Sequence, residues 1–194
     1  MMFKIFFYIN ELNDIQKENL NQLRNVNIIY RNYGGNNYYQ NAIKINRYCK
    51  KKNFKLFVSN DKQLAIRLGS YGLYLPSFNN RDHFTKSNIK VIGSAHNEME
   101  ITDKINQGCE EIFISPIFNT KSHTEKTGRG LAFYRSLMHK YSKQIKIHPL
   151  GGINQKNLGK IISSGSKGFS SKSMIEKKMS KSLISYLNLI ATNL

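Results

Sequence analysis

The feature that most constrains this chain is a regular alternation of short apolar runs with longer amphipathic stretches. Strict alternation of strands with helices is typical of parallel strands joined by helical crossovers, so the pattern predicts an α/β fold. Eight such units in 194 residues favour one short-looped (β/α)8 TIM barrel domain, residues 1–194, over an open doubly wound sheet. The expected strands are Phe3–Ile9, Val26–Arg31, Phe54–Val58, Gly72–Leu75, Lys90–Ser94, Glu111–Ser115, Ile145–Leu150 and Gly168–Ser170.

The stretches between these runs place apolar residues about every 3.6 positions, as amphipathic helices do. Asn60 is a candidate N-cap, and Gly108 and Gly165 mark two expected helix ends. The stretch Pro76–Ser87 is less regular and is expected to hold only a short helix. The expected helices are Asn10–Arg24, Tyr38–Lys52, Asp61–Leu68, Asn97–Asn106, Leu131–Tyr141, Asn154–Ser164 and Ser173–Ile190.

The chain is strongly basic, with 30 Lys and Arg against 12 Asp and Glu and a formal net charge of +18. Such an excess can serve an anionic partner, either nucleic acid or a phosphorylated small molecule. It can also reflect lysines scattered over a solvated surface, which we favour for most of them. The sequence lacks a recognised nucleic-acid motif, which argues against nucleic acid as the partner. The one cluster, Lys50, Lys51, Lys52 and Lys55, is expected at a helix end, where cations suit the dipole.

Two further features exclude other classes of protein. Cys49 and Cys109 lack the spacing of a disulfide scaffold or a metal site, so both are expected to be small buried thiols. No apolar run approaches the roughly 18 residues of a membrane-spanning helix. The N-terminus lacks a small-residue cleavage site and is interpreted as a first strand, so we expect a cytoplasmic protein that does not bind membranes. The oligomeric state is left open.

In a barrel of this kind, the residues at and just after the carboxyl ends of the strands carry the chemistry. Here these positions are almost all polar or glycine, and they outline one polar, cationic mouth. They are Arg31, Asn60–Asp61, Leu75–Asn79, Ser94–His96, Ser115–Ser122, Gly151–Gly152 and Ser170–Ser173.

The seventh and eighth strand ends predict a phosphate site. Gly151 and Gly152 allow backbone N–H groups to approach an anion closely, and Ser171, Lys172 and Ser173 form a hydroxyl-rich turn. Loops at these two positions of a barrel frequently cradle phosphate, and a following helix N-terminus would add positive charge. The alternative is an ordinary glycine C-cap and serine N-cap, which we consider less favoured.

Two further strand ends carry candidate ligand residues. Thr120, Ser122 and His123 belong to a long polar loop and could bind or protonate an anionic group. When this loop is considered alone, an ordinary solvated loop without a binding role is the favoured interpretation. Asp61, next to Asn60, could hold Mg²⁺ against substrate phosphates. An Asn-Asp pair that opens a helix is also an ordinary cap, which is favoured when this pair is considered alone.

The second and fifth strand ends add an arginine, a serine and a histidine. Ser94 could donate to a substrate and His96 could titrate near neutral pH, or both could belong to a helix N-cap cluster. Arg31 either binds a ligand or pairs with a neighbour such as Asp61. We favour ligand binding, because a guanidinium fork suits diphosphate.

Three motifs make the chain similar to the thiamine phosphate synthase family, which includes thiazole tautomerases. They are Ile114-Ser-Pro-Ile-Phe-Asn-Thr120, Leu150-Gly-Gly-Ile-Asn-Gln-Lys-Asn157 and Ser164-Gly-Ser-Lys-Gly168. Val58-Ser-Asn-Asp61 and Gly93-Ser-Ala-His96 resemble two further segments of the family. The resemblance implies a (β/α)8 barrel enzyme that couples hydroxymethylpyrimidine diphosphate to thiazole phosphate and releases diphosphate, with Mg²⁺ as cofactor.

The resemblance also implies roles for individual residues. Arg31, Asn60 and Ser94 would lie at the diphosphate, and Asp61 would hold the metal. Thr120 and Ser122 would contact the thiazole phosphate. The backbone cradle for that phosphate would be formed by Gly152 and the turn Lys172–Ser173.

Four positions depart from the family pattern. Tyr33 replaces a lysine, Ile29 a glutamine, Asn79 the second metal aspartate and His123 a loop lysine, for which Lys121 or Lys126 could substitute. Two other functions therefore remain as alternatives. One is a metal-independent thiazole phosphate tautomerase with His96 or His123 as general acid/base. The other is a non-catalytic protein that binds a phosphorylated ligand or nucleic acid.

Overall fold

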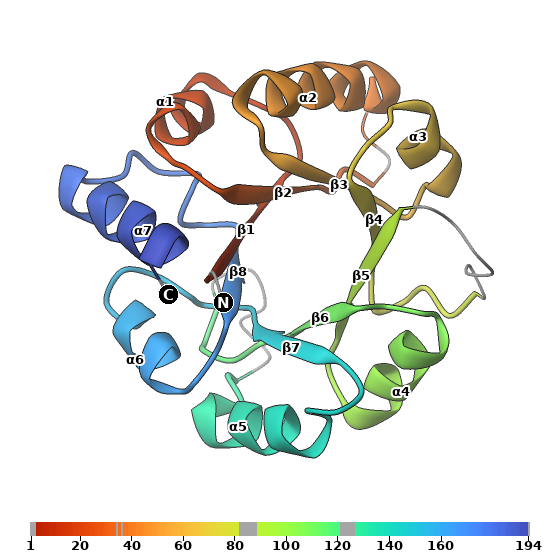
Figure 1. Cartoon of the computed structure of the whole chain (residues 1–194), viewed down its shortest axis with the longest axis vertical. Coiled ribbons are helices and arrows are strands. Elements are labelled where there is room, and N and C mark those ends of the chain that lie inside the picture. The colour runs from red at the N-terminus through yellow and green to blue at the C-terminus, as the bar shows by residue number, and fades with distance from the viewer. Residues whose placement is uncertain (1–2, 34, 36, 82–88, 121–126, 194) are drawn as a thin grey trace.

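The computed structural model describes residues 3–33, 35, 37–81, 89–120 and 127–193, and within them eight parallel strands form one sheet. The strand order is β7-β6-β5-β4-β3-β2-β1-β8, and a bridge between Leu150 and Ser170 joins the two edges into a barrel surrounded by helices (Figure 1). The predicted fold is therefore confirmed. The strands are β1 (Lys4–Ile9), β2 (Val26–Tyr30), β3 (Lys55–Ser59), β4 (Gly72–Leu75), β5 (Lys90–Ala95), β6 (Glu111–Ile114), β7 (Lys146–Pro149) and β8 (Gly168–Ser171).

The helices follow the predicted order around the barrel. Lys50, Lys51 and Lys52 lie in the last turn of α2, as expected, but Lys55 is the first residue of β3 and not part of the helix end. Gly108 and Gly165 follow α4 and α6 with φ angles of 76° and 84°, which confirms them as helix-ending residues. The helices are α1 (Asp14–Gln22), α2 (Tyr38–Lys52), α3 (Lys62–Arg67), α4 (Glu98–Asn106), α5 (Gly130–Lys140), α6 (Leu158–Ser163) and α7 (Lys181–Asn193).

Local capping corrects the predicted starts of two helices. The prediction began the first helix at Asn10, but Asn13 and Gln16 form a reciprocal capping box that fixes the start of α1. Asn60 is not the N-cap of α3. The cap is Asp61, whose side chain accepts a hydrogen bond from Leu64 N at 2.8 Å.

Two later helices also begin further along the chain than predicted. The Asn154 side chain accepts a hydrogen bond from Lys156 N at 2.9 Å, which forms a turn ahead of α6. The last helix was predicted from Ser173, but residues 173–180 form turns, bends and irregular backbone. Ser180 then accepts a hydrogen bond from Leu183 N at 3.2 Å, so α7 starts beside it.

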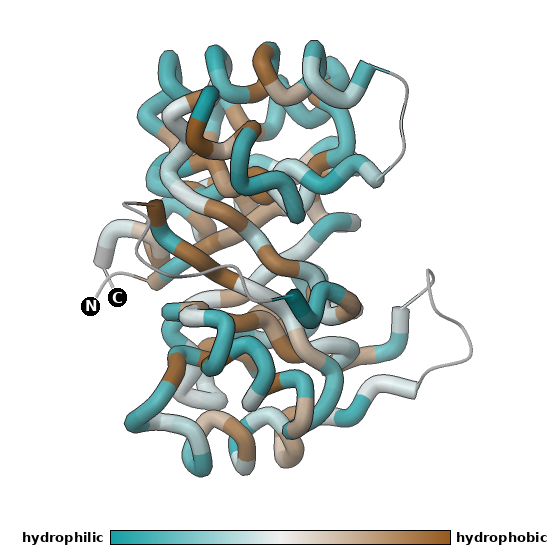
Figure 2. Tube along the Cα trace, turned by 90° about the vertical axis from the view of Figure 1, so that its right-hand side faces the viewer, coloured by the Kyte–Doolittle hydropathy of each residue, from teal (hydrophilic) through white to brown (hydrophobic). Residues whose placement is uncertain are grey.

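The barrel interior is filled mainly by aromatic rings. Phe6 and Phe113 meet edge to face with ring centroids 4.9 Å apart. Figure 2 shows apolar residues concentrated along the strands and hydrophilic residues on the outer helices. Because the interior is packed, ligand sites must lie at the two ends of the barrel. The buried cluster inside consists of Phe6, Tyr8, Ile29, Phe57, Tyr74, Ile92 and Phe113.

The structure bears on two expectations from the sequence, that the cysteines are buried thiols and that the chain has no membrane-spanning helix. Cys49 and Cys109 are free and buried, and burial raises the pKa of each thiol to about 12. Both are therefore poor nucleophiles, as expected. Among the described helices, none has the length and apolar character needed to span a membrane.

A buried ionic cluster lies where the strands begin. Glu111, 4% exposed, accepts a hydrogen bond from Lys4, and its Oε2 lies 2.8 Å from His148 Nε2. Burial alone would raise the pKa of Glu111, but the hydrogen bonds and charges of His148 and Lys4 outweigh it and lower the pKa to about 2. The folded protein therefore holds Glu111 ionised over a wider pH range than the unfolded chain does.

This cluster predicts a loss of stability in acid. A depressed carboxyl pKa stabilises the fold above the ordinary value of 4.5, and this contribution disappears as pH falls from 4.5 to about 2. The loss attributable to Glu111 is on the order of 3 kcal/mol. In urea unfolding measured at successive pH values, Glu111→Gln is expected to be less stable at neutral pH and less sensitive to acid than wild type.

Glu110→Gln is the matched control for Glu111→Gln. Glu110 neighbours Glu111 in the chain, but its side chain is 50% exposed and pairs with Lys90 at 2.8 Å. It should keep the acid sensitivity of wild type. Equal pH profiles for wild type and Glu111→Gln would contradict the assignment of that sensitivity to Glu111.

Candidate functional site

The carboxyl ends of β2 and β1 place Arg31 at the predicted mouth. Its backbone N donates to Ile9 O at 2.9 Å, which extends the pairing of the two strands. The guanidinium carbon lies 4.8 Å from the centre of the Tyr8 ring. Within the described residues Arg31 forms no ion pair, so the predicted alternative of pairing with Asp61 is not seen. The Arg31 charge is thus positioned by stacking and is available to an anion.

Buried tyrosines form the floor beneath Arg31. The Tyr74 hydroxyl donates to Ser94 Oγ at 2.8 Å. The Tyr8 hydroxyl is buried and has no hydrogen-bond partner among the residues that the structure describes. Burial raises the pKa of both phenols, so they remain neutral hydrogen-bond donors. Neither tyrosine was predicted from the sequence as part of the site, although their inward-facing positions in β1 and β4 were a usable signal.

A pair of exposed aromatic residues flanks the floor. Tyr33 and Phe78 meet edge to face with ring centroids 5.4 Å apart, and Phe78 is 65% exposed. The Tyr33 hydroxyl lies 2.7 Å from Ser59 Oγ, which fixes the ring at the end of β3. Tyr33, which stands where the family pattern has a lysine, therefore forms an exposed aromatic wall of the mouth together with Phe78.

The carboxyl end of β3 carries Asn60 and Asp61. Asn60 has a left-handed φ of 58° and its N donates to Tyr74 O at 2.9 Å. Its Oδ1 accepts a hydrogen bond from Asn79, so the two amides lie together. Asp61 caps α3, as the alternative interpretation proposed, and it remains partly exposed beside Asn60.

A buried lysine fixes Asn79. Lys104 is 1% exposed, and its Nζ donates to Asn79 O at 2.5 Å and to Gln107 Oε1 at 2.7 Å. Gln107 in turn donates to Asn79 O and to Arg81 O. A short helix was predicted within Pro76–Ser87, but it is absent from the described residues 76–81, because these backbone contacts hold the segment as a turn. Residues 82–88 lie outside the described residues. The sequence analysis missed Lys104, three positions after Ile101 on the buried side of α4.

The carboxyl end of β5 places His96 against α4. His96 Nδ1 lies 3.0 Å from Glu100 Oε2, and the His96 backbone N donates to the same oxygen at 2.8 Å. Asn97, not Ser94 or His96, is the N-cap of α4. Arg129 donates to the carbonyl oxygen of His96, which connects this loop to the start of α5. The imidazole is therefore oriented by a carboxylate, as a general acid or base requires.

The loops after β6 and β7 are locked together by glycines. Gly151 and Gly152 have φ angles of 92° and 67°. A Cβ on Gly152 would lie 2.5 Å from Asn119 O, and a Cβ on Gly151 would lie 2.9 Å from Pro116 Cα. Phe118 N donates to Gly151 O at 3.1 Å. The two loops thus approach more closely than any larger residue permits.

The same pair of loops presents an unsatisfied hydroxyl. Thr120 Oγ1 is buried and has no hydrogen-bond partner in the described part of the chain. A buried polar atom without a partner costs free energy, so an anion that accepts from Thr120 would gain this interaction. The neighbouring candidates Ser122 and His123, together with Lys121 and Lys126, lie outside the described residues.

The β8 end corrects part of the phosphate argument. The Ser171 hydroxyl donates to Ile153 O at 3.2 Å and accepts from Met174 N at 3.3 Å, so it ties the β7 and β8 loops together. Lys172 lies 3.5 Å from Glu176, and Ser173 is exposed in a turn. Because α7 begins at Lys181, the N-terminus of this helix does not lie at the turn. The helix dipole is thus missing from the predicted phosphate site, while the Thr120 hydroxyl and the backbone groups of the β6 and β7 loops remain as donors.

The donor set for Mg²⁺ is small. In the described ranges no three His, Cys, Asp or Glu side chains gather around one point. Asp61 places a carboxylate at the mouth beside Asn60, whose amide oxygen accepts a hydrogen bond from Asn79. Mg²⁺ is commonly held by one or two carboxylates together with substrate phosphates and water. These residues therefore fit an ion that arrives with a diphosphate, rather than a cage formed by protein alone.

Sequence comparisons agree on one family. Residues 12–175 match the family model described as Thiamine monophosphate synthase. A thiamine-phosphate synthase of Prochlorococcus marinus is 32% identical over 127 residues, which are 61% of this chain and 35% of that protein. Another, from Prochlorococcus marinus subsp. pastoris, is 27% identical over 161 residues, or 80% of this chain and 45% of that protein. The chain thus spans between about a third and a half of the length of these relatives.

Solved structures agree on the fold. A thiamine phosphate pyrophosphorylase from Pyrococcus furiosus superposes with a TM-score of 0.76 at 14% identity, covering 97% of this chain and 95% of that one. A thiamine phosphate pyrophosphorylase from Bacteroides thetaiotaomicron gives 0.63 at 18% identity, covering 97% and 95%. At these identities the likeness establishes the barrel alone.

Proposed function

Because the chain belongs to the thiamine monophosphate synthase family, we propose that it couples hydroxymethylpyrimidine diphosphate to thiazole phosphate. The observation that carries the proposal is that two features suited to anions lie at one end of the barrel. One is the Arg31 charge, stacked on Tyr8 and without a carboxylate partner among the described residues. The other is the pair of interlocked loops that contains Gly151, Gly152 and the unpartnered Thr120 hydroxyl.

The reaction needs charge stabilisation more than proton transfer. The bond between the pyrimidine methylene carbon and the diphosphate oxygen breaks, and its electron pair leaves with diphosphate. The thiazole nitrogen then gives its lone pair to the methylene carbon and forms the new C–N bond. No proton has to move, so fixed donors that stabilise the departing charge are the main requirement.

The residues divide between the two substrates. Arg31, Asn60 and Ser94 hold the diphosphate, while Tyr33 and Phe78 offer an aromatic wall to the planar pyrimidine. Thr120 and the loop of Gly151 and Gly152 hold the thiazole phosphate. Asp61, with Asn60 and Asn79, would hold Mg²⁺. When bound there, Mg²⁺ would neutralise part of the charge on the diphosphate.

The test is product formation by the purified chain from both substrates. We expect thiamine phosphate and diphosphate in equal amounts with Mg²⁺, and little of either with a chelator. Asp61→Asn should lower turnover and raise the Mg²⁺ requirement, yet leave the unfolding midpoint unchanged because Asn is an equally good N-cap. Binding of both substrates without any turnover at high protein concentration would overturn the proposal.

One observation favours a second candidate, a tautomerase acting on a thiazole phosphate carboxylate. His96 is oriented by Glu100 at 3.0 Å, as a general acid/base would be, and Asn79 stands where the family pattern has a second metal carboxylate. Isomerisation that survives a chelator and disappears in His96→Gln would identify this activity. The synthase, in contrast, should lose most of its turnover with the chelator.

A further inference from the structure

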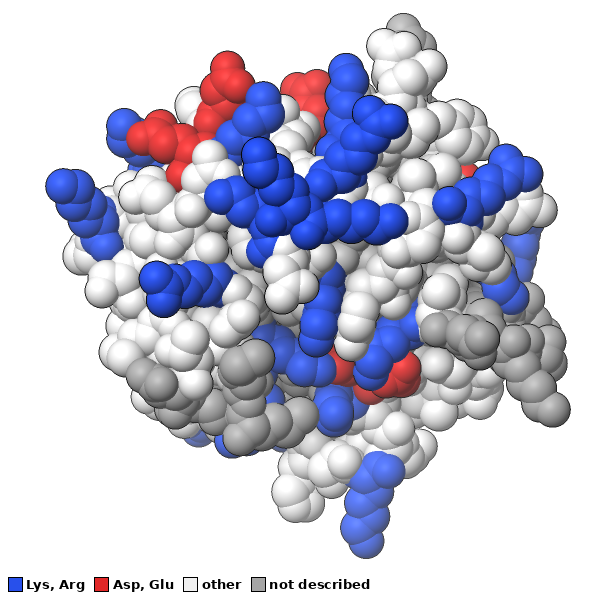
Figure 3. Space-filling model, turned by 45° about the horizontal axis from the view of Figure 1, so that its top comes forward, with Lys and Arg blue, Asp and Glu red and all other residues white. Residues whose placement is uncertain are grey.

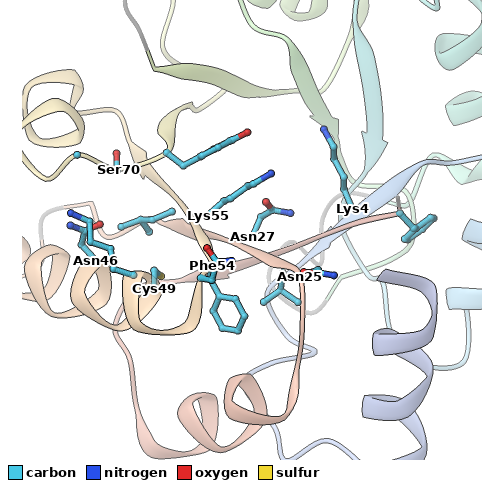
Figure 4. Close-up of a pocket in the computed structure, with 15 residues that line it drawn as sticks. Lys4, Asn25, Asn27, Asn46, Cys49, Phe54, Lys55 and Ser70 are labelled. Carbon is cyan, nitrogen blue, oxygen red and sulfur yellow. The ribbon is translucent and has the colours of Figure 1, made fainter. Parts of the chain in front are cut away.

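A cavity lies at the amino-terminal ends of the strands, at the opposite end of the barrel from the candidate site. Its volume is about 500 Å³, within the range of roughly 300–1,000 Å³ that is usual for small-molecule sites. Lys4, Asn27 and Lys55 come from the beginnings of the adjacent strands β1, β2 and β3. Figure 4 shows Lys4 and Lys55 extending on either side of Asn27, with Asn46 and Cys49 of α2 on another wall. We call this hollow the basal cavity.

The basal cavity is lined by cations and by no carboxylate. Its charged lining residues are Lys4, Lys50 and Lys55. Lys4 pairs with Glu111, which lies outside the lining, and Lys50 Nζ donates to Leu68 O at 3.0 Å. Lys55 lies over the Tyr71 ring and forms no ion pair within the described residues. Figure 3 shows Lys and Arg gathered near the centre of the face it presents, with Asp and Glu toward the upper left edge and a further acidic group among the cations below the centre.

Helix ends do not explain all of these charges. Lysines often neutralise the negative end of a helix dipole, and Lys50 in the last turn of α2 fits that role. Lys4 and Lys55 are each the first residue of a strand, where there is no dipole to neutralise. Lys4 is balanced by the buried Glu111, whereas Lys55 forms no ion pair within the described residues, so Lys55 supplies a positive charge that the fold itself does not require.

Fixed amides and an aromatic ring complete the lining. Asn27 Nδ2 donates to Ile5 O at 3.1 Å, and Asn46 Nδ2 donates to Leu68 O at 2.8 Å. These bonds hold both amides in place, so each can offer its remaining polar atoms without losing side-chain freedom. Tyr71 adds aromatic surface to the same cavity, whereas the Phe54 ring is buried in the core and points away from the lysines (Figure 4). The combination suits a ligand that is anionic at one end and flat and apolar at the other.

We propose that the basal cavity binds a small phosphate monoester that carries a planar ring. The lysines and the fixed amides would take the phosphate, and the wall at Tyr71 would take the ring. A cavity of about 500 Å³ encloses a ligand of nucleotide size but not a nucleic-acid helix. The site is separate from the catalytic proposal, because none of the residues placed in the candidate site lines the cavity.

The test is calorimetric titration of the full chain with adenosine 5′-monophosphate, adenosine and inorganic phosphate. Lys55→Met removes a charge from the basal cavity. Lys44→Met removes a charge from the exposed side of α2, the helix that contributes Asn46 and Cys49 to the cavity wall. We expect the monophosphate to bind at least about tenfold more weakly to Lys55→Met, since a charge-assisted hydrogen bond to the phosphate is lost. Lys44→Met should bind as wild type does. Adenosine and inorganic phosphate should both bind wild type more weakly than the monophosphate.

Each other outcome overturns the proposal. Equal weakening in both variants would show a general effect of net charge. Unchanged binding in Lys55→Met would place the monophosphate elsewhere, and inorganic phosphate binding as tightly as the monophosphate would show that the ring is not recognised. Absence of binding to wild type would exclude the site. Matching unfolding midpoints for the three proteins establish that Lys55→Met is folded.

Discussion

Arg31→Met is expected to lower kcat for thiamine phosphate formation by about 10²–10³-fold, the usual effect of removing one fixed donor from a developing charge. Met keeps an apolar stem over Tyr8, so the variant removes the guanidinium with little loss of packing. Charge on the diphosphate grows as its bond to carbon breaks, so Arg31 should contribute more in the transition state than in the bound substrate. The fall in kcat should therefore exceed any rise in KM, which steady-state kinetics measures directly.

Two further variants separate the guanidinium from charge in general. Arg31→Lys retains the charge but not the planar fork, so we expect it to recover only part of the activity. Arg47→Met removes one positive charge from the exposed surface of α2 and should have full activity. Equal activity in Arg31→Met and Arg47→Met would remove Arg31 from the mechanism.

The fold could be predicted because its signals repeat along the chain. Each strand is a short apolar run, each helix has an apolar face, and eight repetitions leave few alternatives to a barrel. Tyr38–Lys52 was predicted with both helix ends correct. The starts of α6 and α7 were wrong by several residues because they depend on single hydrogen bonds, such as those of Asn154 and Ser180, which periodicity does not reveal.

In the candidate site too, residues that follow from their position at strand ends were predicted, whereas residues whose roles depend on tertiary contacts were not. Strand-end logic predicted Arg31, Asn60 and Asp61, and the structure places all three at one end of the barrel. It did not find Tyr8 or Lys104, since their roles arise from contacts between distant segments. Lys104 reaches Asn79 across 25 positions of sequence, a contact that helical periodicity does not reveal.

The departures from the family pattern also have a physical consequence. Asn79 cannot supply a carboxylate, yet it is held in place by Lys104 and contacts Asn60. A neutral amide beside Asp61 leaves less negative charge for a cation, so the Mg²⁺ affinity of the protein alone should be low. The diphosphate then becomes the main ligand of the ion, which is why substrate and metal are expected to bind together.

Gly152→Ala is expected to reduce kcat/KM by roughly a hundredfold or more, with the loss mainly in binding of thiazole phosphate. The new Cβ would lie 2.5 Å from Asn119 O and 2.7 Å from Phe118 O, which are backbone atoms that cannot rotate away. The φ of 67° adds about 1–2 kcal/mol of strain for a residue with a Cβ. The loop pair must separate, and a displacement near 1 Å at a binding group is enough for such a loss.

Gly159→Ala is the matched control for Gly152→Ala. Gly159 lies in α6, where a Cβ meets no atom within 4 Å. Alanine is the better helix former, so this variant should gain about 0.5–1 kcal/mol and retain full activity. Thermal unfolding should therefore move in opposite directions for the two variants, and only Gly152→Ala should lose affinity for thiazole phosphate in a direct titration. If Gly152→Ala bound thiazole phosphate as wild type does, the β6 and β7 loops would not form the phosphate site, and Thr120 would lose its proposed role with them.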